Sequence, residues 1–281
     1  MDNAKQGEEL NQLSRLLFDT AANDWYLAIG IETLTALIGV GASLAILTND
    51  WKLFLAIIGF ILFIISYYLK LRFENTYDRA ETMRRQSVIT EALGWSIGQT
   101  QFSEWRLRAG KKILDMFKMK SRDKDYYATK KPEGSRRLLE MTTESAFFTR
   151  HLYCKLQRLV WLLFVIAVVF SIIVIGVSQF QFVSPNTRFF VVYGIYLLLP
   201  VMLTVDLLGL GLRLGRLSTS IKEVEEDLER LDKEKRINET QVMRLISEYN
   251  CQVTSGVPIH SFLFKLWHDE INELWIKRYK K

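Results

Sequence analysis

Four long apolar blocks constrain this chain more than any other feature of its sequence. They cover about residues 25–48, 53–69, 159–178 and 189–212, and strongly charged segments separate the second from the third and follow the fourth. A bilayer core about 30 Å thick needs about 20 apolar residues in a helix, with a lower limit of about 17, so all four blocks are long enough to cross it. This clustering excludes a soluble single domain, a collagen-like chain and a disordered chain.

The blocks pair into two hairpins, which predicts an all-α membrane protein with four transmembrane helices. The first block follows an acidic polar leader and lacks a small-residue cleavage site, so we do not expect a cleaved signal peptide. The predicted parts are a leader (1–24), a first transmembrane hairpin (25–69), a basic helical insert (70–158), a second hairpin (159–212) and a helical, coiled-coil tail (213–281).

Lysine and arginine are distributed very unevenly over the polar segments. The insert 70–158 holds 20 of them and the tail 213–281 holds 13, whereas each hairpin loop holds one, Lys52 and Arg188. Loops rich in Lys and Arg stay in the cytoplasm. We therefore expect the insert, the tail and both termini to be cytoplasmic.

The insert reads as a series of helices. We predict a helix that continues from the second span to about residue 92, and a break at Gly94 and Gly98. A second helix is expected from about Ser103 to Lys120, followed by a loop over 118–131. Ser135 is expected to cap the helix that leads into the third span.

The tail carries a heptad-like seam after the fourth span. Apolar residues alternate spacings of four and three, as in a coiled coil. Two interpretations stay open: self-association through the seam, or packing on a neighbouring helix of the same subunit. A second amphipathic helix follows Pro258, and we favour its packing on the cytoplasmic helices over a place in the membrane interface. The seam runs through Leu217, Ile221, Val224, Leu228 and Leu231, and is expected to continue through Lys235 and Asn238 to Val242, Leu245 and Tyr249.

No residue pattern indicates an enzyme, a metal site or a cofactor. The sequence contains two cysteines outside any C-x-x-C spacing, and its three histidines lack metal-ligand spacing. It contains no Gly-rich phosphate loop, no G-x-S-x-G and no H-E-x-x-H. We expect neither catalysis nor a bound cofactor.

Two acids lie inside the predicted spans. Glu32 and Asp206 sit roughly 10 Å from the cytoplasmic boundary at about 1.5 Å per residue. A carboxylate facing lipid is costly, so each should face a partner, the bundle interior or water. Three interpretations of the two acids remain. They form a structural clasp between the first and fourth helices, in which the carboxyl groups share a proton or a hydrogen bond, or they form a ring that attracts cations into an oligomeric pore. The third interpretation is a proton or ion relay of the transporter kind. The four predicted spans contain no cation that would neutralise the acids.

Small residues and a proline mark the fourth span. Pro200 is expected to kink it, because proline removes a backbone donor. Gly209 and Gly211 then allow either a flexible gate or close helix packing.

Basic residues cluster in the insert. Two explanations of these clusters stay open. One is attraction to anionic lipid headgroups. The other is a site for a phosphorylated ligand, in which arginines bind the phosphates and aromatic rings stack on the bases. The candidate phosphate-binding residues are Arg106, Arg108, Lys111, Lys112, Arg136 and Arg137, with Trp105, Tyr126 and Tyr127 as candidate stacking rings.

The layout of leader, hairpin, cytoplasmic insert, hairpin and helical tail resembles the four-transmembrane effectors of bacterial anti-phage nucleotide-signalling operons, of the CBASS or Hailong type. The segment that begins at Asp125, Tyr126 and Tyr127 is similar to the family's junction between insert and third span, and "GVPIHSFLFKLWHDEINELW" to its closing aromatic helix. The resemblance implies a multi-pass protein of the bacterial inner membrane. It also implies a nucleotide or oligonucleotide ligand made by a partner nucleotidyltransferase.

These features together predict an oligomeric channel that a nucleotide gates and that depolarises the membrane when active. We expect a homo-oligomer, with a tetramer as the first guess. The alternative from another class is a non-conducting membrane anchor that recruits a protein partner through its coiled-coil tail.

Overall fold

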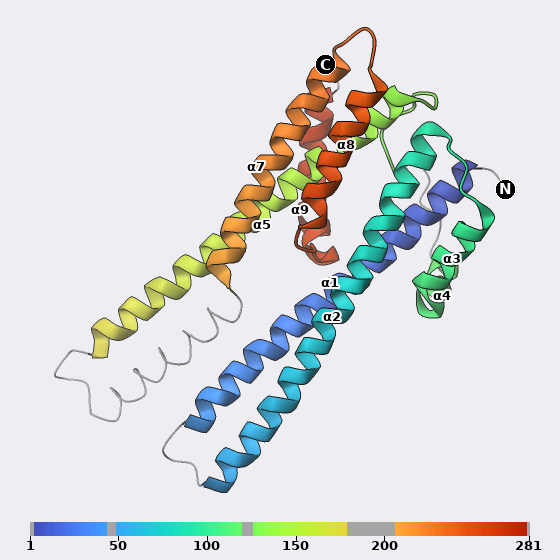
Figure 1. Cartoon of the computed structure of the whole chain (residues 1–281). Coiled ribbons are helices and arrows are strands. Elements are labelled where there is room, and N and C mark those ends of the chain that lie inside the picture. Colours follow the sequence, from blue (N-terminus) through green and yellow to red (C-terminus); the bar gives the residue numbers. More distant parts are fainter. Residues whose placement is uncertain (1–2, 44–48, 120–125, 179–205, 280–281) are drawn as a thin grey trace. The chain divides into compact units, whose positions relative to one another are not determined.

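The computed structural model describes residues 3–43, 49–119, 126–178 and 206–279. Within these ranges the chain is all-α, as predicted (Figure 1). Its helices are α1 (Asn3–Ser43), α2 (Asn49–Leu93), α3 (Gln99–Ala109), α4 (Lys111–Met119), α5 (Ser135–Ser178), α7 (Leu207–Asp232), α8 (Glu239–Thr254) and α9 (Ser261–Tyr279).

The chain folds into two compact units, and α1, α2, α5 and α7 contribute residues to both. The apolar unit comprises Asp24–Arg72 and Lys155–Arg213, and the polar unit comprises Met1–Asn23, Phe73–Cys154 and Leu214–Lys281. The apolar unit therefore contains all four predicted spans. The polar unit gathers most of the leader, the insert and the tail.

Two helices among the described residues are long and apolar enough to cross a membrane, α2 from Asp50 and α5 as far as Ile173. Only 11% of the most apolar stretch of each helix is buried inside the molecule. The first predicted span forms the second half of α1 up to Ser43, and its last residues, 44–48, lie outside the described ranges. Most of the fourth predicted span, 189–205, also lies outside them.

Polar contacts join α1 and α2 at one end of the apolar unit. Arg72 donates two hydrogen bonds to Asp24, from Nε at 2.7 Å and from Nη2 at 2.8 Å. Ser66 is fully buried and donates to the carbonyl oxygen of Ala28 at 3.2 Å. A paired arginine and aspartate satisfy each other's hydrogen-bonding groups, which makes their burial tolerable.

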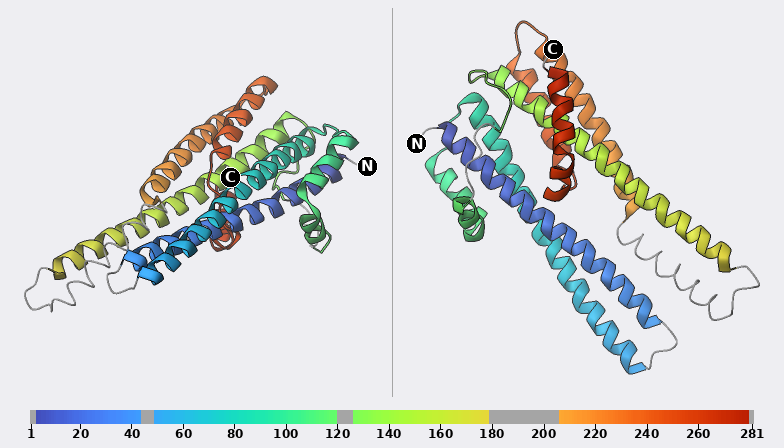
Figure 2. Two further views of the ribbon diagram at one scale, coloured as in Figure 1. Left: turned by 60° about the horizontal axis from the view of Figure 1, so that its bottom comes forward. Right: turned by 180° about the vertical axis from the view of Figure 1, so that it is seen from behind.

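The first half of α1 packs in the core of the polar unit. Its leucines recur at spacings of three and four, which places them on one helix face. They contact the second half of α2 and both short helices, and Figure 2 shows α3 and α4 beside this part of α1. The buried cluster consists of Leu10, Leu13, Leu16, Leu17, Ala80, Met83, Ile97, Phe102, Trp105, Ala109 and Ile113.

Glycines end the helices of the insert. Gly94 has φ +67°, its N–H donates to the carbonyl of Thr90, and a side chain there would collide with Glu133. This is the left-handed C-terminal cap that glycine favours, so the predicted end of the helix near residue 92 is confirmed. The predicted single helix from Ser103 to Lys120 is wrong, because Gly110 at φ +84° divides α3 from α4.

The remaining helix boundaries follow local sequence signals. The start of α5 at Ser135 is confirmed, although the hydroxyl of Ser135 donates to Glu239 at 2.8 Å instead of capping its own helix. Asn238 caps α8, because its side chain accepts from the N–H of Thr240 at 3.0 Å.

The predicted continuous seam of the tail is wrong, because α7 ends at Asp232 and α8 begins at Glu239. Neither Lys235 nor Asn238 lies in a helix. The seam residues of α7 are buried within the chain, and Ile221 and Leu228 are completely inaccessible. The structure therefore favours packing within the subunit, and this seam is not exposed for self-association.

The predicted helix after Pro258 is α9, and it packs on α5 as favoured from the sequence. Ile271 and Trp275 of α9 form a buried cluster with Phe147 and Leu152 of α5. The apolar face expected from the sequence comprises Ile259, Phe262, Leu263, Leu266, Ile271 and Leu274. It does not pack as one surface, because Phe262 and Leu266 are exposed.

Candidate functional site

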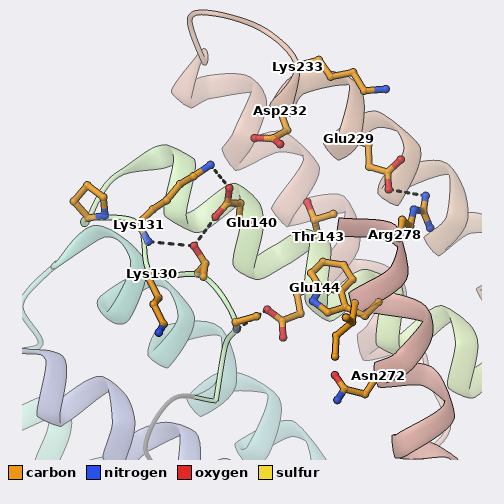
Figure 3. A pocket seen from close by; sticks show the side chains of 15 residues that line it. Lys130, Lys131, Glu140, Thr143, Glu144, Glu229, Asp232, Lys233, Asn272 and Arg278 are labelled. Carbon is orange, nitrogen blue, oxygen red and sulfur yellow. Dashed lines mark hydrogen bonds and ion pairs between the residues drawn. The ribbon is translucent and has the colours of Figure 1, made fainter. Parts of the chain in front are cut away.

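A cavity of about 1040 Å³ lies in the polar unit. Its walls are the segment 128–132, α5, the end of α7 and α9 (Figure 3). Pockets of this size accommodate small organic ligands. It is lined by Ala128, Thr129, Lys130, Lys131, Pro132, Glu140, Thr143, Glu144, Glu229, Asp232, Lys233, Asn272, Trp275, Ile276 and Arg278.

Two of the four cations that line the cavity are held by carboxylates of the same lining. Lys131 forms an ion pair with Glu140, which also accepts a hydrogen bond from Thr129. Arg278 contacts Glu229 with 2.5 Å between Nη2 and Oε1. Figure 3 shows both pairs at opposite ends of the cavity. These pairs neutralise one another and position the segment 128–132 and α9.

The other charged groups of the lining have no such compensation within the described part of the chain. Lys130 and Lys233 form no ion pair there, and Oδ1 of Asp232 is buried without a hydrogen-bond partner. A buried acceptor without a partner costs free energy. The cavity therefore offers two cations and one carboxylate oxygen to a ligand.

Glu144 is the fourth acid of the lining, and its pKa is raised to about 7. Burial is the main cause, because it penalises the charged form, and the nearby carboxylate of Glu140 adds to the shift. The N–H of Ala128 donates to Oε2 of Glu144 at 3.0 Å, and this hydrogen bond lowers the pKa and so offsets part of the rise. Near neutral pH this carboxyl group both accepts and donates hydrogen bonds.

A buried ion network fixes α9, which forms one wall of the cavity. Glu225 of α7 is completely inaccessible and contacts Arg150 of α5 at 3.0 Å and Arg278 of α9 at 2.7 Å. The pKa of Glu225 is raised, because its burial outweighs the attraction of the two arginines. The network joins three helices, so the cavity depends on it for its shape.

The six predicted phosphate-binding residues do not line this cavity. Arg106 and Arg108 lie on α3, and Lys111 and Lys112 begin α4. Arg106 pairs with Glu9 at 3.4 Å and Arg108 with Glu104 at 3.8 Å.

Arg136 and Arg137 lie in the first turn of α5 and serve packing contacts. Arg136 donates to the backbone carbonyl of Glu234 at 3.0 Å, and Arg137 pairs with Glu91 at 3.5 Å. Of the proposed stacking rings, Trp105 and Tyr127 are buried. Those two rings therefore belong to the core.

Glu32 has a partner that the sequence analysis did not foresee. Nζ of Lys70, in α2, lies 2.5 Å from Oε1 of Glu32. The predicted spans themselves contain no such cation, but Lys70 comes one residue after the second span and its side chain reaches back to Glu32. The pair supports the interpretation of Glu32 as a structural contact.

Asp206 precedes α7 and caps it. Its Oδ1 accepts from the N–H of Gly209 at 3.1 Å, and its φ is +46°. A Cβ at Gly209 would collide with the Asp206 carboxylate, so the glycine leaves room for this cap. A Cβ at Gly211 would lie 3.2 Å from the Trp161 ring, which supports close helix packing at that position. Pro200 lies outside the described residues.

The lining of the cavity was largely missed from the sequence. The sequence placed Lys130 and Lys131 only in the predicted loop 118–131, and their partners on α7 and α9 are about 100 and 150 residues away. Only the fold brings these three segments together. Among the described residues no group of three or more His, Cys, Asp or Glu residues could hold a metal ion.

The chain matches no family model, and neither a curated protein nor a solved structure is similar to it.

Proposed function

We propose that the protein is a membrane channel whose polar unit binds a nucleotide signal, so that ligand binding controls ion flow through the apolar unit. The observation that carries this proposal is the combination, in one chain, of lipid-compatible helices with a ligand-sized charged cavity. The resemblance to anti-phage effectors adds the biological setting: depolarisation of the bacterial inner membrane after infection.

The surface of the apolar unit supports a membrane location. A core helix of a soluble protein is mostly buried, whereas the apolar stretches of α2 and α5 are 11% buried. Trp51, Tyr67 and Tyr68 are exposed at the two ends of the apolar part of α2, where interfacial aromatic residues belong. Together with the distribution of lysine and arginine, this favours four spans with both termini in the cytoplasm.

The cavity supports a ligand that carries both phosphates and hydrogen-bonding bases. Lys130 and Lys233 are available to phosphate oxygens. The carboxyl oxygens of Glu144 and Asp232 and the amide of Asn272 can accept hydrogen bonds from the amino groups of a base. The mixed lining suits a nucleotide better than an inorganic polyphosphate, because its carboxylates would repel the latter.

The continuity of helices supports control of one unit by the other. α1, α2 and α5 each have residues in both units without a helix break at the boundary. Because α5 lines the cavity, a rearrangement there can be transmitted along the same continuous helix to its apolar half. Four helices alone make a poor pore, so we retain a homo-oligomer, with a tetramer as the first guess.

The alternative of a non-conducting anchor loses its main support. It depended on a coiled-coil seam in the tail, and those side chains are buried inside the polar unit. No other observation favours it.

Ion flux from proteoliposomes tests the proposal. The purified full-length chain is reconstituted with an entrapped dye, and cyclic dinucleotides, cyclic trinucleotides and short DNA oligomers are added in turn. We expect flux to depend on one of these classes. The replacement of Lys130 and Lys233 by Gln should raise the half-maximal concentration at least tenfold, because each charge-assisted hydrogen bond contributes about 1.5–3 kcal/mol.

Lys235 and Arg236 provide the matched control. They are exposed and do not line the cavity, so their replacement by Gln should leave the response unchanged. A reconstituted protein that passes no ions with or without any of these ligands would remove the channel proposal. A nucleotide response that is indifferent to Lys130 and Lys233 would move the binding site elsewhere.

A further inference from the structure

The outer surface of α3 and α4 is unusually basic. The segment 99–119 carries five cations against the two acids Glu104 and Asp115. The inner faces of both helices are buried against α1 and α2, so the charged residues lie on the outside. The cations are Arg106, Arg108, Lys111, Lys112 and Lys118.

Much of this charge is not neutralised inside the molecule. Lys111 and Lys112 are exposed and form no ion pair with any described residue. Arg108 and Lys118 pair only with exposed acids of their own helices, at 3.8 and 3.5 Å. Such exposed pairs are weak and do not prevent either cation from meeting another anion.

Long apolar side chains stand among these cations. Leu107 is 78% exposed and Met119 is 89% exposed. Leu107 directly precedes Arg108, and Met119 directly follows Lys118. Single exposed apolar residues are common, and on a basic surface they add apolar contacts to the electrostatic ones that a membrane surface offers.

We propose that the outer face of α3 and α4 binds the anionic lipid surface of the membrane, with Lys111 and Lys112 on phosphate headgroups and Leu107 and Met119 among the acyl chains. The cations are spread over two helices, which fits a diffuse negative surface better than one compact phosphate group. This inference uses the membrane location of the proposed function but not its ligand or its conduction.

The chain itself tethers this face to a bilayer. α3 and α4 are covalently continuous with α2, which is long and apolar enough to cross a membrane. Binding is therefore intramolecular and needs only weak contacts. Each basic residue near an anionic membrane tightens such contacts about fivefold.

Lipid quenching of a fluorophore tests the contact. Cys154 and Cys251 are replaced by Ala and Met119 by Cys, which is labelled with an environment-sensitive fluorophore. The full-length chain is placed in nanodiscs that contain nitroxide lipid, either in phosphatidylcholine alone or with about one third phosphatidylglycerol. We expect severalfold stronger quenching in the anionic discs, and a loss of that difference at high salt, because salt screens the attraction.

Charge reversal supplies the variant and its control. Lys111→Glu with Lys112→Glu should abolish the difference between the two kinds of disc. These changes put acids into the first turn of α4, which the helix dipole favours, so α4 should stay folded. Lys235→Glu with Arg236→Glu makes the same change in net charge at exposed residues between α7 and α8 and should leave the quenching intact.

Three results would overturn the inference. The first is equal quenching in both kinds of disc, and the second is an equal effect of the control variant. The third is a fluorophore that is shielded from water in neutral discs but is not quenched by lipid, which would indicate a protein partner or a second copy. If the chain does not insert into nanodiscs at all, the membrane location of the proposed function fails instead.

Discussion

Glu144 should destabilise the polar unit when it ionises, so Glu144→Gln should stabilise the protein at alkaline pH. The pKa of this carboxyl group rises from 4.5 to about 7 on folding, chiefly because of burial. The folded state therefore holds the proton more tightly than the unfolded state. The stability of the folded protein falls as pH rises from about 4.5 to about 7 and stays reduced above that.

The size of the effect follows from the shift. A shift from 4.5 to about 7 corresponds to roughly 3 kcal/mol at about 1.4 kcal/mol per unit. Glu144 keeps part of its surface at the cavity, where water screens the charge, so we expect about 1–2 kcal/mol. The glutamine retains the acceptor for the N–H of Ala128. A change of 1 kcal/mol moves the Tm of a chain of this size by about 2–4 °C.

The assay is thermal unfolding of the purified protein in detergent at pH 5 and pH 8. Glu144→Gln should raise the Tm by roughly 2–8 °C at pH 8 and leave it nearly unchanged at pH 5. Glu248→Gln, at an exposed acid of α8, is the control and should shift neither value. A variant that is less stable than the parent at pH 8, or one stabilised equally at both pH values, would refute the assignment of a buried, proton-holding carboxyl group.

Two further predictions concern the other acids. Glu225→Gln should cost about 1–3 kcal/mol, because it leaves the largely buried Arg150 without its carboxylate, whereas Arg278 keeps Glu229. Thermal unfolding measures this, Glu226→Gln at an exposed position of α7 is the control, and equal Tm values would contradict it. Glu32→Gln together with Asp206→Asn should lower thermal stability without changing the reversal potential in a salt gradient, because the structure gives both carboxylates local partners; an open double mutant with reduced cation preference would show that they line the ion path.

Local features of the fold were predictable from the sequence. Glycines and a serine ahead of an apolar-periodic run are short-range signals, and they located the end of α2 at Gly94 and the start of α5 at Ser135, whereas the cap at Asn238 was not predicted. Apolar length likewise identified α2 and α5 as candidate spans. The break at Gly110 was missed, because a single glycine inside an amphipathic pattern does not by itself end a helix.

The cavity could not be predicted in the same way. Its charges come from the segment 128–132 and from α5, α7 and α9, and spacing within each segment says nothing of their convergence. The predicted coiled-coil seam of the tail was wrong for the same reason. A heptad pattern reports that one face of a helix is apolar, but not whether the surface that covers it belongs to the same chain or to another copy.

The positions of the two acids in the predicted spans show why depth along a helix is a poor guide to function. Equal distance from the cytoplasmic boundary suggested a common site for Glu32 and Asp206. Lysine side chains extend along a helix surface, so Lys70 neutralises Glu32 although it lies beyond the apolar block. Asp206 satisfies a helix N-terminus, where a carboxylate is favourable without any ion. Each acid therefore has a structural reason to be present, and a selectivity role for either would have to act in addition to that reason.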